Sequence, residues 1–188
     1  EKLKKVTEPR PGEEIFGMTM ITLKGKTILV ADTNVQDFPS PERLVKVSKS
    51  CVRVARLFGF DPKVAFLSHS TFGKPISKNT KHVRDAIDLL RKEKVDFDFD
   101  GEMQPDVALN PIYQDIYPFS KIVGNANILI MPALHSAAIS TKLMKVFGGG
   151  KLIGPLLIGL GSPIEVAPLR ASTSEILNLA SIAAYSSD

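Results

Sequence analysis

Short apolar runs alternate along this chain with segments whose apolar residues recur at helical spacing, and this alternation constrains the fold most strongly. Two runs, Lys63–Leu67 and residues 126–132, have the length and composition of strands buried in a parallel sheet. Ahead of both runs, Ser40-Pro41-Glu42 carries the signals of a helix start: a capping hydroxyl, an early proline and an acid in the first turn. Strands that alternate with helices predict an α/β fold with a mainly parallel sheet.

The remaining elements follow from the same patterns. Two apolar strands flank residues 24–26, which predicts a hairpin over 18–31. Residues 95–100 alternate strictly between apolar and acidic side chains, so we expect a strand whose three acids face solvent. Further elements are expected, in chain order, as a helix with Val83, Ile87 and Leu90 on one face, a helix over 136–147 with Ile139, Leu143 and Val146 on one side, a strand over 152–160, a short strand over 164–167 and a last helix that begins near Ser172.

The composition, with 44% hydrophobic and 23% charged residues among 188, is that of an ordinary globular protein. It argues against disorder, and the chain lacks the run of roughly 18 apolar residues that a membrane span needs. Residues 1–94 carry a formal charge of +8 and residues 95–188 one of −4. The basic half could meet an anionic ligand, or its cations could simply solvate two helices. The net charge of +4 is too small to indicate nucleic acid binding.

Cysteine and histidine are sparse, with one Cys51, three histidines and no CxxC, HxxxH or HExxH motif, which argues against a zinc site. A single cysteine forms no internal disulfide, so we expect a cytoplasmic protein. Because Cys51 lies on an apolar helical stripe, we expect a buried, inert thiol. The charged first 14 residues, which hold two prolines and do not begin with Met, are expected to form a linker rather than a signal peptide.

Polar residues 68–74 follow the predicted strand Lys63–Leu67, and ligands of open parallel sheets bind at the carboxyl ends of strands. Hydroxyls, a glycine and a lysine at this place suit a phosphate or another anion. The alternative is an ordinary polar loop between a strand and a helix, since the P-loop pattern is absent. The candidate ligand-binding residues of this loop are Ser68, Ser70, Thr71, Gly73 and Lys74.

The three histidines carry no recognisable catalytic pattern. His135 precedes Ser136, but nothing places an acid beside it, so we expect it to be structural or to face solvent. We expect His82, within a charged helix, to lie on the surface. His69 could donate to a ligand from its loop, although we expect that it does not.

Several blocks resemble, in order, the C-terminal part of the phosphate acetyl/butyryltransferase family, from about Thr27 to the end of the chain. Two flanking stretches, residues 10–13 and 132–142, resemble more closely the phosphotransacetylase-like C-terminal domain of bacterial NADP-dependent malic enzymes. The blocks that carry the resemblance are residues 67–73, 100–106, 126–132 and 153–164.

The resemblance implies two three-layer α/β/α lobes, similar to those of isocitrate and isopropylmalate dehydrogenases, with one lobe inserted into the other and a ligand cleft between them. In that scheme residues 1–27 are a linker and the entry strand of the first lobe. Residues 28–145 are the inserted lobe, and residues 146–188 are the closing segment of the first lobe. The earlier half of the first lobe would lie upstream.

Working transferases of the family carry a Ser-Arg pair and a nearby Asp after the last Pro-Ile strand. In this sequence Pro168, Leu169 and Glu175 hold those three positions, so the resemblance implies no catalytic residue here. Arg170, one place further on, and Glu175 join the expected ligand-binding set. No metal ligand is expected in this domain.

The expected function is therefore that of a regulatory, acetyl-CoA-sensing and oligomerisation domain of an NADP-dependent malic enzyme, which converts malate to pyruvate by oxidative decarboxylation. One alternative is an active phosphate acetyltransferase that makes acetyl-CoA from acetyl phosphate, and another is an oligomerisation scaffold without a ligand. We expect no cofactor in this domain, whereas NADP and a divalent metal belong upstream. The expected partners are acetyl-CoA or a related metabolite, the upstream malic enzyme domain and further copies in a homodimer or larger oligomer, with neither nucleic acid nor membrane.

Overall fold

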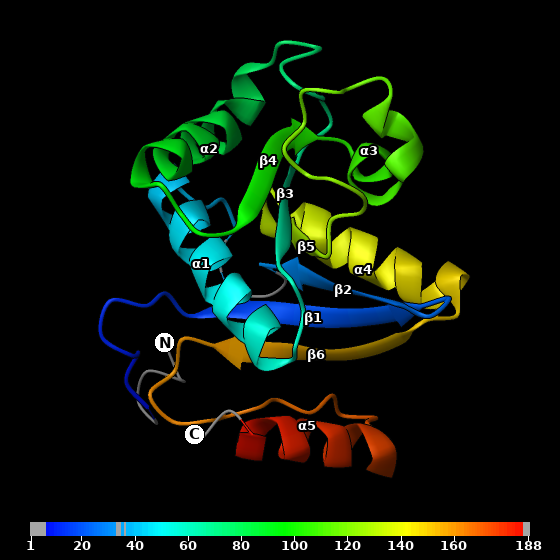
Figure 1. Cartoon of the computed structure of the whole chain (residues 1–188). Helices are drawn as coiled ribbons and strands as arrows, with labels where there is room; N and C mark the ends of the chain where they lie inside the picture. The colour runs from blue at the N-terminus through cyan, green and yellow to red at the C-terminus, as the bar shows by residue number, and fades with distance from the viewer. Residues whose placement is uncertain (1–6, 33–34, 36, 186–188) are drawn as a thin grey trace.

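A six-stranded mixed sheet forms the centre of the protein in the computed structural model, which describes residues 7–32, 35 and 37–185 (Figure 1). The strands are β1 (Phe16–Leu23), β2 (Lys26–Ala31), β3 (Lys63–Leu67), β4 (Asp98–Met103), β5 (Ile128–Ile130) and β6 (Lys151–Ile158). The helices are α1 (Pro41–Leu57), α2 (Lys81–Glu93), α3 (Pro105–Leu109), α4 (Leu134–Gly148) and α5 (Thr173–Tyr185), with short 3₁₀ turns at Lys78–Thr80 and Pro111–Gln114.

The strand order is β4-β3-β5-β2-β1-β6. The first four strands in this order pair in parallel, whereas β1 is antiparallel to both β2 and β6. Every strand except β1 therefore ends at the same edge of the sheet, which confirms the α/β fold and makes this edge the place to look for a ligand.

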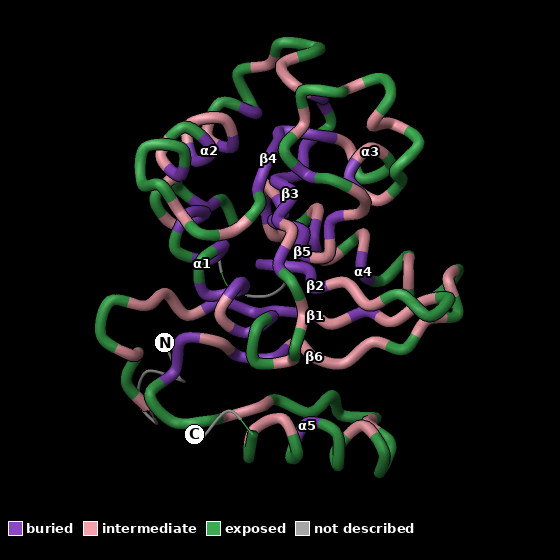
Figure 2. The backbone as a smooth tube through the Cα atoms, in the orientation of Figure 1, coloured by how far each residue is buried: buried purple, intermediate pink, exposed green. Residues whose placement is uncertain are grey.

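Helices cover both faces of the sheet. Alternate residues of β3 separate the two layers, since Val64 and Phe66 pack with α1 and α2, and Ala65 and Leu67 pack with α3 and α4. The purple segments of Figure 2 follow the central strands and the inner sides of these helices. Helix α5 lies beside β6 and contributes one buried residue, Leu179, to the first core. The division into domains at residues 27/28 and 145/146 stays a prediction.

Local sequence signals place the ends of these elements as expected. The hairpin turns at Lys24 and Gly25, which both have positive φ (50° and 75°), the conformation that matches the twist of the flanking strands. The Ser40 hydroxyl accepts a hydrogen bond from the Arg43 N–H and caps α1. Gly149, at φ 62°, ends α4.

Two expectations from the sequence are wrong in detail. Asp100 is buried in β4, where the Lys121 N–H and the Arg91 guanidinium satisfy its carboxylate, while Asp96 and Asp98 face solvent as expected. Residues 164–167 form no strand, because they leave the sheet and run irregularly toward α5. No helix among the described residues is long and apolar enough to cross a membrane.

The helix α4 carries the expected apolar residues on one side, and this side faces outward. Ala137 and Thr141 face the sheet, whereas Ile139, Leu143 and Val146 are 58%, 51% and 75% exposed. These three apolar residues therefore form a stripe that the described residues do not cover.

Candidate functional site

The loop after β3 brings the predicted hydroxyls together but directs them inward. Ser68, Ser70 and Thr71 are 6%, 0% and 8% exposed. The Ser70 hydroxyl donates to Glu102 Oε1 at 2.8 Å, and the Gly73 N–H donates to the same oxygen at 3.2 Å. Two loop donors therefore already hold an anion that belongs to the protein itself.

Glu102 reaches the loop from β4 and is completely buried. Its Oε1 also accepts a hydrogen bond from Arg84 Nη1 of α2 at 3.1 Å. Its Oε2 is buried without a hydrogen-bond partner among the described residues. Burial of a carboxylate costs folding free energy unless the group is paired and hydrogen-bonded. The contacts with Arg84 and Ser70 offset this cost for Glu102.

Further hydrogen bonds fasten the loop to β4 and to the segment behind it. The Phe72 N–H donates to the Glu102 carbonyl at 2.7 Å, and the Gln104 N–H donates to Thr71 Oγ1 at 3.2 Å. Gln104 Nε2 donates to the His69 carbonyl at 2.7 Å. Lys74 lies exposed at the rim. The loop is thus held in one shape, and ligand contact by its residues stays a prediction.

Arg170 and Glu175 lie beside the opposite end of the sheet. Glu175 accepts hydrogen bonds from the Ser172 N–H (2.8 Å) and hydroxyl (2.9 Å), and Ser172 Oγ accepts from the Glu175 N–H, which is a capping box at the start of α5. These hydrogen bonds lower the pKa of Glu175. Since α5 packs on β6, three strands separate it from β3, about 19 Å at ordinary strand spacing. The structure therefore does not bring these two residues to the loop.

Arg84 and Glu102 are the residues of the loop's hydrogen-bond network that the sequence analysis missed. Glu102 stands in one of the blocks that carry the family resemblance, and this was the available signal. No signal in the sequence pointed to Arg84, because the pattern of its helix indicated only one apolar face and a charged, solvated one.

A cavity of about 420 Å³ adjoins the loop at the carboxyl ends of β3 and β5. We call it the histidine cavity, because its lining includes His69, His82 and His135, together with Ser68, Ser136 and Phe38. His69 comes from the loop, His82 from the first turn of α2 and His135 from the first turn of α4. His82 is only half-buried and Nε2 of its ring donates to the Pro132 carbonyl at 2.9 Å, so the expected surface residue has a structural partner.

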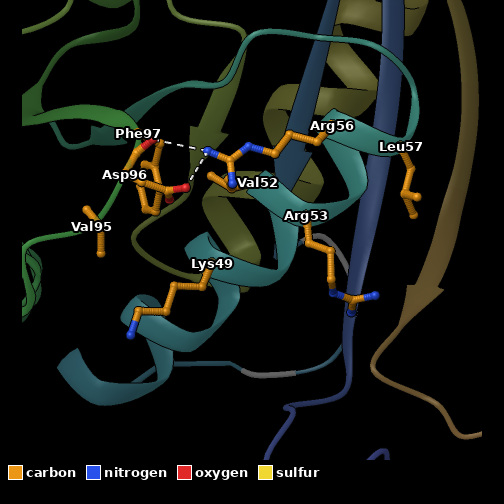
Figure 3. Close-up of a pocket in the computed structure, with 8 residues that line it drawn as sticks. All are labelled: Lys49, Val52, Arg53, Arg56, Leu57, Val95, Asp96 and Phe97. Carbon is orange, nitrogen blue, oxygen red and sulfur yellow. Dashed lines mark hydrogen bonds and ion pairs between the residues drawn. The ribbon is translucent and has the colours of Figure 1, made fainter.

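A groove of about 580 Å³ runs along the outer face of α1, where Figure 3 shows Arg56 reaching Asp96 while Lys49 and Arg53 extend away from it. Each cation of this groove pairs with an acid. Arg56 bonds to Asp96 at 3.1 Å, Arg53 pairs with Glu13 at 2.7 Å and Lys49 pairs with Glu93. The cations are thus balanced within the protein, which favours the interpretation of a solvated helix face.

A third cavity, of about 490 Å³, lies between α1, α5 and the end of β6. Glu165 lines it and accepts a hydrogen bond from the Leu157 N–H at 3.1 Å. Burial raises the pKa of Glu165 to about 7. In the described part of the chain, no group of three His, Cys, Asp or Glu residues is placed to hold a metal ion.

Comparison with known proteins gives consistent matches. A family model described as phosphate acetyl/butaryl transferase matches residues 2–184. The NADP-dependent malic enzyme of Rhizobium meliloti (strain 1021) is 43% identical over 185 residues, which are 98% of this chain and 24% of that enzyme. The phosphate acetyltransferase of Bacillus subtilis (strain 168) is 31% identical over 155 residues, 82% of this chain and 48% of that enzyme.

A solved structure agrees with these matches. The EutD phosphotransacetylase from Staphylococcus aureus superposes with a TM-score of 0.90 at 28% identity, over 98% of this chain and 58% of that one. The chain therefore spans about a quarter of the length of the malic enzyme, and about half that of the transferases, that it matches.

Proposed function

Because the chain belongs to the phosphate acetyl/butaryl transferase family, we propose that it is a regulatory domain of an NADP-dependent malic enzyme and senses acetyl-CoA. The observation that carries this proposal is the similarity to malic enzymes over nearly the whole chain, at 43% identity with one of them. In this proposal the remaining part of the polypeptide oxidises malate with NADP and a divalent metal, and this domain changes its activity without reacting itself.

The segment before α5 supports a sensing role over a transferase role. Pro168 and Leu169 stand where the resemblance places a serine and an arginine, and Leu169 is fully exposed. Neither side chain deprotonates a thiol or binds a phosphate. General-base assistance alone contributes about 10²–10⁴-fold to such reactions. The alternative of an active phosphate acetyltransferase rests on the similarity to enzymes of that name.

The loop at residues 68–74 is the proposed contact with the anionic part of acetyl-CoA. Lys74 is exposed at its rim, while Ser68, Ser70 and Thr71 shape the loop from within through Glu102 and Gln104. A preshaped loop binds with little loss of conformational entropy.

Calorimetry and kinetics on the natural polypeptide that carries this chain test the proposal. We expect acetyl-CoA to bind and to change the rate of malate oxidation, and Lys74→Gln to weaken both effects by about two- to fivefold, the usual worth of one exposed charge. Lys92→Gln, at the exposed end of α2, is the matched control and should leave both unchanged. An absence of acetyl-CoA binding to the wild type would contradict the sensing role, and formation of acetyl-CoA from acetyl phosphate would favour the transferase.

The stripe on α4 favours an additional role in oligomerisation. Ile139, Leu143 and Val146 expose apolar surface that a second copy of the chain would cover. We expect sedimentation to show a dimer or larger oligomer that Leu143→Glu dissociates. Leu177→Glu, on the exposed face of α5, serves as the control. A wild type that sediments as a monomer at high concentration would refute this role.

A further inference from the structure

Residues 7–15, which we call the entry segment, are fastened to the rest of the protein at two places. At the first place, their backbone lies against the residues that follow β6. The Arg10 N–H donates to the Gly159 carbonyl at 2.9 Å, and the Gly161 N–H donates to the Glu8 carbonyl at 2.8 Å. The entry segment is thus held as a short antiparallel extension beside the end of β6.

Two glycines make this close contact possible. A Cβ atom at Gly159, where φ is 86°, would overlap the carbonyl oxygen of Glu14. A Cβ atom at Gly161 would lie 2.9 Å from the carbonyl oxygen of Glu8. Because glycine has no Cβ, the backbone of the entry segment can approach both positions.

The second place is α1, where two acids of the entry segment meet three cations. Glu13 pairs with Arg53 at 2.7 Å. Glu14 pairs with Arg43 at 2.6 Å and with Lys46 at 3.1 Å. Ion pairs that are partly open to solvent contribute little individually, so the entry segment can leave α1 while the core stays folded.

Arg43 extends this attachment to the edge of the sheet at which β2 ends. Its Nη2 donates to the Ile15 carbonyl at 2.6 Å and to Asp32 Oδ2 at 3.5 Å. Asp32 directly follows β2, and its Oδ1 accepts hydrogen bonds from the Gly17 N–H at 2.9 Å and the Val35 N–H at 3.2 Å. One guanidinium therefore joins the entry segment, α1 and the end of β2.

We propose that Arg43 and the entry segment form a latch that couples a ligand at this edge of the sheet to the upstream part of the polypeptide. While the latch is closed, a displacement at the end of β2 reaches the entry segment through Asp32 and Arg43. When the acids of the segment leave α1, the upstream part moves independently. Coupling of this kind needs contiguous contacts with two alternative arrangements, and the fastened and the released segment are those two.

This inference rests on the proposed function, in which the malic enzyme part lies upstream and acetyl-CoA is the ligand. The test uses the natural polypeptide with Glu13→Gln and Glu14→Gln together. We expect hydrogen exchange at the Arg10 and Gly161 amides to become about tenfold faster, because three weak ion pairs are lost. Acetyl-CoA should still bind, but its effect on the rate of malate oxidation should fall about three- to tenfold.

Glu93→Gln with Asp96→Asn is the matched control, because these two acids pair with Lys49 and Arg56 of the same helix. The control removes ion pairs of α1 and keeps those of the entry segment, so it should preserve both the slow exchange and the effect of acetyl-CoA.

Three results would overturn the proposal: unchanged exchange in the test variant, a full effect of acetyl-CoA despite faster exchange, or an equal loss of that effect in the control. If acetyl-CoA does not bind to the wild type, the proposed function fails, whereas the exchange measurement still decides whether the two acids hold the entry segment.

Discussion

Arg84→Met should destabilise the protein more than Glu102→Gln does, although both changes break the same ion pair. The Glu102 side chain is 0% exposed and that of Arg84 is 31% exposed. Without Arg84, a carboxylate remains buried with only the Ser70 hydroxyl and the Gly73 N–H. Removal of one partner from a buried pair costs about 3–5 kcal/mol, and the partial exposure of Arg84 puts the expected loss at about 3 kcal/mol.

Glu102→Gln leaves a neutral acceptor for Ser70, and water can solvate the charge that remains on Arg84. The expected loss is about 1–2 kcal/mol, which is the scale of a charge-assisted hydrogen bond. Arg84 also donates to Thr80 Oγ1 at 2.5 Å and to the Ser77 carbonyl at 2.9 Å, so Arg84→Met removes more than the ion pair. A double-mutant cycle separates these contributions from the pair.

Urea unfolding followed by circular dichroism provides the free energies by linear extrapolation. The double variant should be more stable than Arg84→Met alone, because it holds no unpaired buried charge. If Glu102→Gln is the more damaging single change, or if the two losses simply add, the argument from buried charge is wrong.

Three further predictions follow from the fold. Burial raises the pKa of Glu165 to about 7, above its ordinary 4.5, so the folded protein binds more protons and loses stability as the pH rises from about 4.5 to 7; Glu165→Gln should flatten that part of a stability-pH profile. Ser172→Ala removes the cap of α5 and should cost about 1 kcal/mol in urea unfolding, with Ser181→Ala on the same helix as the control. Burial raises the pKa of the Cys51 thiol, so a thiol reagent should modify it in urea but not in the native protein, and rapid native labelling would contradict the buried position.

Periodicity and capping signals were enough to predict most elements of the sheet and its helices. Ser40 lies at a helix start because its hydroxyl accepts a hydrogen bond from the Arg43 N–H. Gly149 lies at a helix end because its backbone adopts a positive φ. Alternation in β4 predicted the strand but not the burial of Asp100, because the partners of that carboxylate come from α2 and from a distant loop. A local pattern does not contain such contacts.

The site shows the same limit more clearly. The hydroxyls of residues 68–74 were recognisable from their place after a strand, yet their partner Glu102 lies 32 residues from Ser70 in sequence. On α4, helical spacing identified the apolar stripe but not its direction. Ala137 and Thr141 are small enough to sit against the sheet, which leaves Leu143 and Val146 outside.

The position of β1 between β2 and β6 has a consequence for how the chain assembles during synthesis. Phe16 pairs with Ile158, although β1 is complete long before the ribosome has made β6. Until residues 151–158 emerge, one side of β1 remains a row of unpaired N–H and C=O groups, which is the template that drives pairing between separate chains. Closure of the sheet is therefore a late event of high contact order. A nascent chain halted before Lys151 should therefore aggregate more readily than the complete chain.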